Sequence, residues 1–250
     1  MKIAYGSDFH LEHRFTDDGE YKPDLPPIPD CDLVIVAGDA GIAGQGLQWL
    51  EQNLNGKPAI FIPGNHEYYY YSNDSVNDYF KNYENDNIRI LNPGVIEIND
   101  TIFIGANLRS ALELPGYTSI SSTVWARSIG DFQVIEDWTP EKHVDQHLEE
   151  VGFIQEQLEK YSDKNCIVIS HYVPTMQCIS PFFANSPLNP YFINDLDWLI
   201  DEHKPDAWVF GHTHTKFNKL HSNEHTQLRC NPRGYPNENR RRYSWEIFEI

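Results

Sequence analysis

Five short runs of apolar residues recur along the chain, and each run ends in a small residue followed by polar side chains. The runs are four or five residues long, rich in β-branched and aromatic residues, and apolar at both alternating positions. This pattern predicts strands that are buried on both faces, as in a sheet covered by helices. The predicted strands are residues 2–5, 33–37, 59–62, 166–169 and 207–210.

Helical patterns fill the intervals between these strands. The clearest helix starts after Thr139, a good N-cap, with Pro140 in its first turn and apolar residues at spacings of three or four as far as Leu158. Its residues His143 and His147 lie four apart, and we expect them on a solvated helix face. Shorter helices are predicted at residues 46–53, 75–83 and 194–202.

A second group of strands is predicted in the middle and at the end of the chain. Between residues 88 and 106, short strands separated by Asn and Gly turns predict an antiparallel meander in a second sheet. Residues 227–230 and 243–250 also have the pattern of strands. No Pro/Ser-rich linker interrupts the sequence. We therefore expect one α/β domain over residues 1–250, with two packed sheets flanked by helices and the irregular residues 107–136 as a candidate lid or insertion.

Composition restricts the environment of the protein. Forty per cent of the 250 residues are hydrophobic, which is enough for a sizeable core. No apolar run approaches the ~20 residues of a membrane span, and the amino terminus lacks the apolar stretch of a signal peptide. The four cysteines form no Cys-x-x-Cys pair. We therefore expect a cytoplasmic protein that does not use a membrane as partner.

The net charge of −18 disfavours broad electrostatic capture of nucleic acid. The charge is uneven, because residues 216–242 hold seven Lys or Arg and only two Glu. Such a segment either contacts a phosphate group or faces water. Nucleic acid is therefore a disfavoured partner, although this segment does not exclude it. The sequence does not define the oligomeric state.

Side chains that bind divalent cations follow all five of the first predicted strands. In an open α/β sheet, ligands bind beyond the carboxyl ends of the strands. Aspartate, asparagine and histidine supply the oxygen and nitrogen donors that hard and borderline divalent metals prefer. The candidates are Asp8, His10, Asp39, Asn65, His66, His171, His212 and His214.

Each candidate alone has an ordinary structural explanation. An aspartate after a strand can cap a turn, and a single histidine can be a hydrogen-bonded core residue. Five separate strand ends that all carry metal-binding side chains are not explained in this way. The sequence therefore predicts a metal site at the carboxyl edge of the sheets.

The same residues form an ordered series of motifs that resembles the calcineurin-like metallophosphoesterase family. The motifs are Asp8-Phe9-His10, Gly38-Asp39, Gly64-Asn65-His66-Glu67, His171 and Gly211-His212-Thr213-His214. The closing stretch 231–236 is similar to one that is common in bacterial members. The resemblance implies a four-layer α-β-β-α sandwich with two mixed sheets and an active site at the carboxyl ends of the strands.

The resemblance also implies a metal-dependent phosphoric ester hydrolase that uses two divalent ions. The implied ligands are Asp8, His10, Asp39 and His214 for the first ion, and Asp39, Asn65, His171 and His212 for the second. Manganese is favoured, with iron, zinc or a mixed pair as alternatives. His66 resembles the catalytic histidine of the family, which protonates the leaving oxygen or stabilises its charge. Glu67 would then orient its imidazole.

The expected substrate is a phosphate-ester small molecule or a nucleotide. An acid such as His66 helps to expel an alkoxide, which favours a phosphodiesterase or small-nucleotide hydrolase over a monoesterase. Arg109, Arg127 and Arg233 are candidate substrate contacts, because a guanidinium group binds phosphate bidentately, with surface salt bridges as the alternative. The other functions left open are a nuclease and a non-catalytic scaffold of the same fold, although a scaffold has no use for a complete ligand set.

Overall fold

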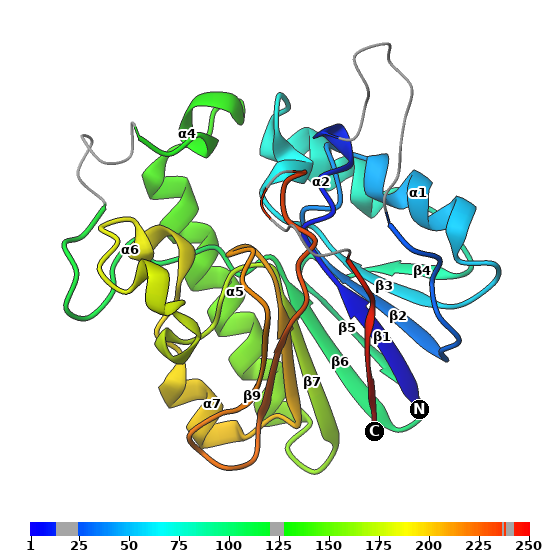
Figure 1. Cartoon of the computed structure of the whole chain (residues 1–250). Coiled ribbons are helices and arrows are strands. Elements are labelled where there is room, and N and C mark those ends of the chain that lie inside the picture. Colours follow the sequence, from blue (N-terminus) through cyan, green and yellow to red (C-terminus); the bar gives the residue numbers. More distant parts are fainter. Residues whose placement is uncertain (14–24, 121–127, 237, 239–242) are drawn as a thin grey trace.

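The computed structural model describes residues 1–13, 25–120, 128–236, 238 and 243–250. Two β-sheets pack face to face, and helices cover the outer face of each sheet (Figure 1). This confirms the predicted α-β-β-α sandwich with two mixed sheets. Within the described ranges, no helix combines the length and the apolar character that a membrane crossing requires.

The first sheet has the strand order β11-β1-β2-β3-β4. Strands β1 to β4 pair in parallel, and β11 pairs antiparallel with β1. Parallel pairing puts the carboxyl ends of β1, β2 and β3 at the same edge. The strands are β1 (Lys2–Gly6), β2 (Leu33–Ala37), β3 (Ala59–Ile62), β4 (Ile88–Ile90) and β11 (Glu246–Glu249).

The second sheet has the strand order β5-β6-β7-β8-β10-β9. Its central strands β6, β7, β8 and β10 are parallel, and the edge strands β5 and β9 are antiparallel to their neighbours. The strands are β5 (Gly94–Ile98), β6 (Thr101–Ala106), β7 (Asn165–Ser170), β8 (Ala207–Phe210), β9 (Phe217–Leu220) and β10 (Gln227–Cys230).

One prediction about these strands is wrong. The stretch between residues 88 and 106 does not form a single meander, because β4 pairs in parallel with β3 in the first sheet. Only β5 and β6 form an antiparallel hairpin in the second sheet. The three residues of β4 carry a strand pattern but too few side chains to specify the sheet that they join.

Helices pack on the outer faces of the sheets. The helices are α1 (Gln45–Asn53), α2 (Asn73–Lys81), α4 (Asp131–Val134), α5 (Pro140–Lys160), α6 (Asn189–Phe192) and α7 (Asp197–His203). Short 3-10 turns are η1 (Leu11–His13), η2 (His66–Tyr68), η3 (Met176–Cys178) and η4 (Pro181–Phe183). Thr139 caps α5 as predicted, because its side chain accepts a hydrogen bond from the N–H of Lys142. Helix α7 starts later than predicted, at Asp197, and the side chain of Asn194 donates to Leu108 O.

The strands divide the core between their two faces. In β2, Leu33 and Ile35 belong to the apolar cluster between the sheets, where they pack with residues of β3, β7 and β8. Val34 and Val36 belong to the cluster that includes residues of α1 and α2. Burial on both faces explains why these strands are apolar at every position.

The buried face of α5 carries polar side chains, contrary to the prediction for His143 and His147. His143 Nε2 lies 3.2 Å from the N–H nitrogen of Ser110, and His147 Nδ1 lies 2.7 Å from Arg109 O. Glu150 Oε2 accepts the N–H of Arg109 at 2.9 Å. These side chains bind the backbone of the segment that follows β6, and this segment uses them in place of sheet hydrogen bonds.

The predicted lid at 107–136 lies partly outside the described residues, because 121–127 are not among them. Its described part forms a small core of its own, in which Leu112, Ile120 and Ile129 pack with Tyr172 and Tyr191. The segment then enters α4, which borders the site described next.

Candidate metal centre

The carboxyl ends of five strands from both sheets meet at one edge of the sandwich. Strands β1, β2 and β3 come from the first sheet, and β7 and β8 from the second. The residues that follow them lie together and are buried or nearly so. The structure thereby brings together all seven predicted ligands, namely Asp8, His10, Asp39, Asn65, His171, His212 and His214.

Two glycines allow this close approach. A Cβ atom at Gly64 would collide with Asp39 Oδ1, and a Cβ atom at Gly38 would collide with the ring of His171. Gly38 also has a φ of +84°, which side-chain-bearing residues rarely adopt. At these two positions, the small residue before the polar cluster is therefore required for steric reasons.

Several ligand residues have a strained backbone. The φ angle is positive at five of the seven, which are Asp8 (55°), His10 (47°), Asp39 (52°), His212 (72°) and His214 (49°). This region is sparsely populated by residues other than glycine, and each such residue costs about 1–3 kcal/mol. Such strain persists where the surrounding structure imposes it, and it collects at functional sites.

The first ligand cluster contains Asp8, His10 and His214. The Nε2 atoms of the two histidines are 2.9 Å apart, and His214 Nε2 lies 3.5 Å from Asp8 Oδ1. The outer nitrogens are held by carboxylates, with His10 Nδ1 3.1 Å from Glu12 Oε1 and His214 Nδ1 2.5 Å from Glu238 Oε2. A carboxylate accepts the Nδ1 hydrogen, so each ring in its neutral form presents a lone pair at Nε2. Burial lowers the pKa of His214, but its contacts with Asp8 and Glu238 outweigh burial and raise it to about 10, so a cation would displace a proton from this ring. Two facing lone pairs beside a carboxylate fit a cation between them.

The second ligand cluster contains Asp39, His171 and His212. His171 Nε2 lies 3.3 Å from Asp39 Oδ2 and 3.2 Å from His212 Nδ1, while His171 Nδ1 donates to Ala37 O at 2.9 Å. The ring of His212 packs on that of Tyr172, with centroids 3.9 Å apart. Burial lowers the pKa of His212 well below its usual value, so its imidazole stays neutral. Neutral imidazole is the form that binds a metal ion.

Asp39 faces both clusters with a single oxygen. Its Oδ2 lies 3.3 Å from His171 Nε2 and 4.0 Å from His10 Nε2. Its other oxygen accepts the N–H of His66 at 2.9 Å. Burial alone would raise the pKa of Asp39, but the charges of His171 and His66 hold it well below the usual range. An ionised oxygen in this position can contact two cations at once.

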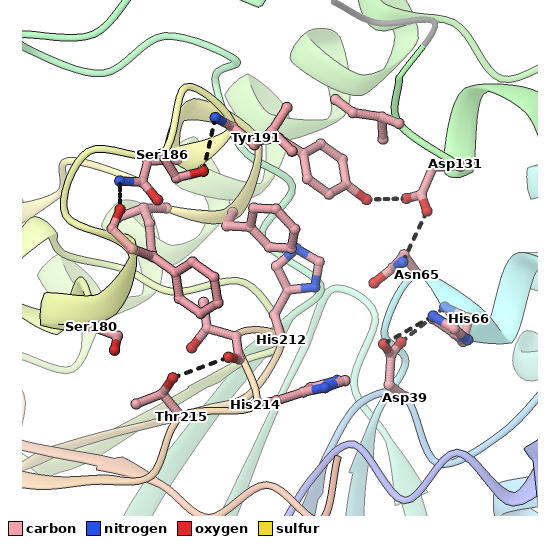
Figure 2. Close-up of a pocket in the computed structure, with 18 of the residues that line it drawn as sticks. Asp39, Asn65, His66, Asp131, Ser180, Ser186, Tyr191, His212, His214 and Thr215 are labelled. Carbon is pink, nitrogen blue, oxygen red and sulfur yellow. Dashed lines mark hydrogen bonds and ion pairs between the residues drawn. The ribbon is translucent and has the colours of Figure 1, made fainter. Parts of the chain in front are cut away.

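Asn65 is oriented by a residue that the sequence did not indicate. Its Oδ1 lies 3.1 Å from His171 Nε2, and its Nδ2 donates to Asp131 Oδ1 at 2.9 Å (Figure 2). Asp131 Oδ2 in turn accepts the hydroxyl of Tyr191 at 2.5 Å and lies 3.4 Å from Arg109 Nη1. Because Asp131 binds the amide nitrogen, the amide oxygen is left facing the second cluster.

The predicted arginine contacts are placed differently. Arg109 is fully buried, pairs with Asp131 and packs its guanidinium over Trp138 and Tyr172, so its position does not match a substrate contact. Arg233 is also buried, its backbone N–H donates to Ser7 O next to β1, and its contact with a substrate stays a prediction. Arg127 lies outside the described residues.

His66 lies beside the two clusters and is oriented by Glu12. His66 Nδ1 is 2.8 Å from Glu12 Oε1, and the ring stacks on Tyr69 with centroids 4.1 Å apart. Its Nε2 is 3.2 Å from Tyr235 Oη. Burial lowers the pKa of His66, but the charges of Asp39 and Glu12 outweigh burial and raise it to about 9. Cations bound at Asp39 would offset part of that increase.

The prediction that Glu67 orients His66 is wrong. Glu67 lies at the start of η2, which directs its side chain away from the His66 ring and beneath the loops. Its buried carboxylate accepts four backbone N–H groups at 2.6–3.2 Å, those of Gly64, Asp39, Ala40 and Gly41. Glu67 therefore joins the loops that follow β2 and β3.

A cavity of about 610 Å³ opens beside the two clusters (Figure 2). Asp39, Asn65, His212 and His214 line one side of it, and residues from α4, η4 and α6 line the other. Tyr69 also lines this cavity, whereas Tyr68 is buried in the core and Tyr70 and Tyr71 are exposed.

The sequence prediction missed four residues of the site, namely Glu12, Asp131, Tyr235 and Glu238. Glu12 could have been found two residues after His10, and Tyr235 lies in the closing stretch that resembles bacterial sequences. No local pattern marks Asp131 or Glu238.

Known proteins resemble this chain in sequence and in fold. The sequence model of the calcineurin-like phosphoesterase family matches residues 1–216. The uncharacterized protein L509 of Acanthamoeba polyphaga mimivirus is 29% identical over 245 residues, which cover 85% of this chain and 84% of that protein.

Solved structures with the same fold include a phosphopantetheinyl hydrolase from Mycobacterium tuberculosis, with a TM-score of 0.71 and 18% identity over 95% of this chain and 90% of that one. A dimetal phosphatase from Danio rerio has a TM-score of 0.53 and 12% identity over 92% of this chain and 86% of that one. At these identities the likeness concerns the fold.

We expect Asp131→Ala to weaken metal binding at the second cluster. Without its acceptor, the amide of Asn65 is free to turn, and loss of such an outer partner costs about 10–100-fold in metal affinity. Equilibrium titration with Mn²⁺ measures the effect, and the exposed Asp145→Ala serves as the control. Unchanged affinity in Asp131→Ala would show that Asn65 is oriented by other contacts.

We expect Glu67→Gln to lower the free energy of unfolding by about 2–5 kcal/mol. The new amide group offers one acceptor oxygen where four backbone N–H groups need two, and buried donors without partners are costly. Urea unfolding of Glu67→Gln, compared with the exposed Glu136→Gln, measures this. Equal midpoints in the two variants would contradict the role of Glu67 in joining the loops.

Proposed function

The chain belongs to the calcineurin-like phosphoesterase family and is a metal-dependent phosphoester hydrolase, and we propose that it hydrolyses phosphodiesters of small molecules with two bound divalent ions. The observation that carries this proposal is the position of Asp39 Oδ2 between the two ligand clusters, 3.3 Å from His171 Nε2 of the second and 4.0 Å from His10 Nε2 of the first. One cluster alone would support a single ion, whereas a shared carboxylate supports two ions at close range.

The proposed ligands follow from the two clusters. They are Asp8, His10, Asp39 and His214 for the first ion, and Asp39, Asn65, His171 and His212 for the second. Since the two ligand carboxylates neutralise only part of the charge of two divalent ions, the centre is cationic within an acidic protein. A cationic centre suits an anionic phosphoryl group. Manganese fits the mixed oxygen and nitrogen donors and is our first choice of ion.

When bound, the two ions supply a nucleophile from water at neutral pH and electrostatic stabilisation of the phosphoryl group. The protein residues contribute the rest. Asp39 would contact both ions and Asn65 the second, and Glu67 and Asp131 hold these two residues in place. Glu12 and Glu238 keep the Nδ1 hydrogens on His10 and His214, so that the Nε2 atoms remain available as ligands.

We assign the proton donor to His66. Glu12 holds its Nδ1, so the proton that can be given away is on Nε2, the atom that faces Tyr235 and lies 3.8 Å from Asp39 Oδ2. An acid in this place assists departure of an alkoxide, which leaves a phosphodiester with difficulty. This role favours phosphodiesters with an alkoxide leaving group over esters whose leaving group is already stable without a proton.

The cavity supports a small substrate over nucleic acid. In the described part of the chain, no residue that lines the cavity is a lysine or an arginine. Two described cations from the basic segment have other contacts, since Lys216 pairs with Glu246 and Arg229 packs over Phe248. A nuclease would need basic side chains along its groove.

We expect metal analysis to find two Mn²⁺ ions per chain in the wild type, one in Asp8→Asn and none in Asp39→Asn. Asp8 belongs to the first cluster alone, whereas Asp39 belongs to both, so the two substitutions of the same kind separate the ion positions. Elemental analysis after dialysis counts the ions. Two ions retained in Asp39→Asn would refute the shared ligand.

We expect His66→Ala to keep its metal ions but to lose rate according to the leaving group. Phenyl methyl phosphate, with a poor leaving group, should react about 10²–10⁴-fold more slowly, since the proton donor is missing. The p-nitrophenyl ester, whose leaving group needs no proton, should be much less affected. A full rate on the phenyl ester would refute the assignment of His66.

We expect Glu12→Gln to move the alkaline limb of the pH–rate profile to lower pH. Activity needs protonated His66 and is lost as pH rises through its pKa, which Glu12 raises. Removing that charge lowers the pKa, so the loss begins earlier. The profile of kcat on the phenyl ester is the measurement, and the p-nitrophenyl ester is the control. An unmoved limb would show that Glu12 does not tune His66.

A further inference from the structure

The cavity beside the metal centre has an apolar side that the proposed chemistry does not use. This side, here called the apolar arm, is lined by Ile129, Ile179, Phe183, Leu188, Phe192 and Ile193. It comes from α4, η4 and α6 and from the residues next to them. An apolar surface of this kind, continuous with a site that binds a phosphoryl group, fits the rest of the substrate.

Hydrogen bonds and ring packing fix the position of the apolar arm. Asn189 donates from its side chain to Phe183 O at 2.8 Å and lies 3.1 Å from Tyr117 Oη. The phenol of Tyr117 donates to Ala184 O at 2.6 Å. Phe192 packs on the ring of His212, with centroids 4.9 Å apart. The arm is thus a preformed surface that begins at a ligand of the second cluster.

The charge of the lining restricts what the arm can bind. The polar residues on this side include the uncharged Ser180 and Ser186. The acidic residues in the lining outside the metal clusters, Asp131 and Glu238, would repel a second negative group. An uncharged group is therefore favoured over a second phosphate or a carboxylate.

The position of the arm indicates which ester group it receives. His66 and Asp39 lie on one side of the cavity, and Ser180, Ser186 and Tyr191 lie on the other (Figure 2). The leaving group must point toward the proton donor, His66. The group that stays bonded to phosphorus can then extend past His212 into the arm.

We propose that the apolar arm binds an uncharged, mainly apolar chain that remains esterified to the phosphoryl group, so that the preferred substrates are phosphodiesters with one such chain. This inference rests on the proposed function and specifies its substrate class. In the reaction, the oxygen of water bonds to phosphorus, the bond from phosphorus to the leaving oxygen breaks, and the products are the chain's monophosphate and the free alcohol.

The test uses p-nitrophenyl phosphodiesters that share a leaving group and differ in the other ester. We expect kcat/KM to rise about three- to fourfold for each methylene buried, and at least tenfold from methyl to hexyl. A chain of the same length that ends in a carboxylate should lose most of this gain. The assay uses the Mn²⁺-loaded full chain, and p-nitrophenolate release needs no proton from His66.

Two neighbouring phenylalanines give a matched pair of variants. Phe183 lines the arm and is 46% exposed, whereas Phe182 does not line it and is 87% exposed. We expect Phe183→Ser to flatten the dependence of kcat/KM on chain length. Phe182→Ser should behave as the wild type. Because both side chains are exposed and lie outside the hydrophobic core clusters, neither change should prevent folding.

Binding of methyl and hexyl phosphonate to the Mn²⁺-loaded protein, measured by calorimetry, tests the arm without turnover. Hexyl phosphonate should bind at least tenfold more tightly, and equal affinities would overturn the inference. If the methyl diester is hydrolysed but chain length has no effect, the inference fails and the proposed function stands. If no diester is hydrolysed by protein with both ions bound, the proposed function fails, and the phosphonate titration still decides on the arm.

Discussion

The arrangement of the site depends on the buried carboxylate of Glu67. Four backbone N–H groups, three from the loop after β2 and one from the loop after β3, donate to this side chain. The two loops therefore cannot separate without leaving donors unpaired. Asp39 and Asn65 sit on these loops, and their distance from each other is therefore fixed by the protein itself. Burying an acidic group is costly, and here four hydrogen bonds offset that cost.

Other acidic side chains act one layer outside the ligands. Glu12, Glu238 and Asp131 each bind the outer nitrogen of a ligand or of His66, and each contact decides which atom faces inward. Because Asp131 is itself held by the hydroxyls of Tyr69 and Tyr191 in the cavity wall and by Arg109 in the core, the orientation of Asn65 depends on residues outside the proposed ligand set. Arg109, predicted as a substrate contact, supports the site from within the core.

Much of the fold and of the candidate metal centre could be predicted, because both follow from local sequence pattern. Strands that are apolar on both faces imply parallel sheets, parallel sheets bring their carboxyl ends together, and the polar residues after each strand then meet. The parts that could not be predicted depend on the direction in which a side chain points and on contacts between residues far apart in sequence. Glu67 follows His66 directly, yet η2 turns it toward the backbone, and Glu12 from another loop takes its expected place. Asp131 is 66 residues from Asn65 in sequence, with no pattern that connects them.

Each ligand cluster draws on both halves of the sandwich. Asp8 and His10 follow a strand of the first sheet and His214 one of the second, and the second cluster is likewise divided between Asp39 and the pair His171 and His212. An ion held in either cluster is therefore a cross-link between the two sheets. The metal content of the protein would then influence how tightly this end of the sandwich is closed, and chelators would lower the stability of the fold as well as remove the ions.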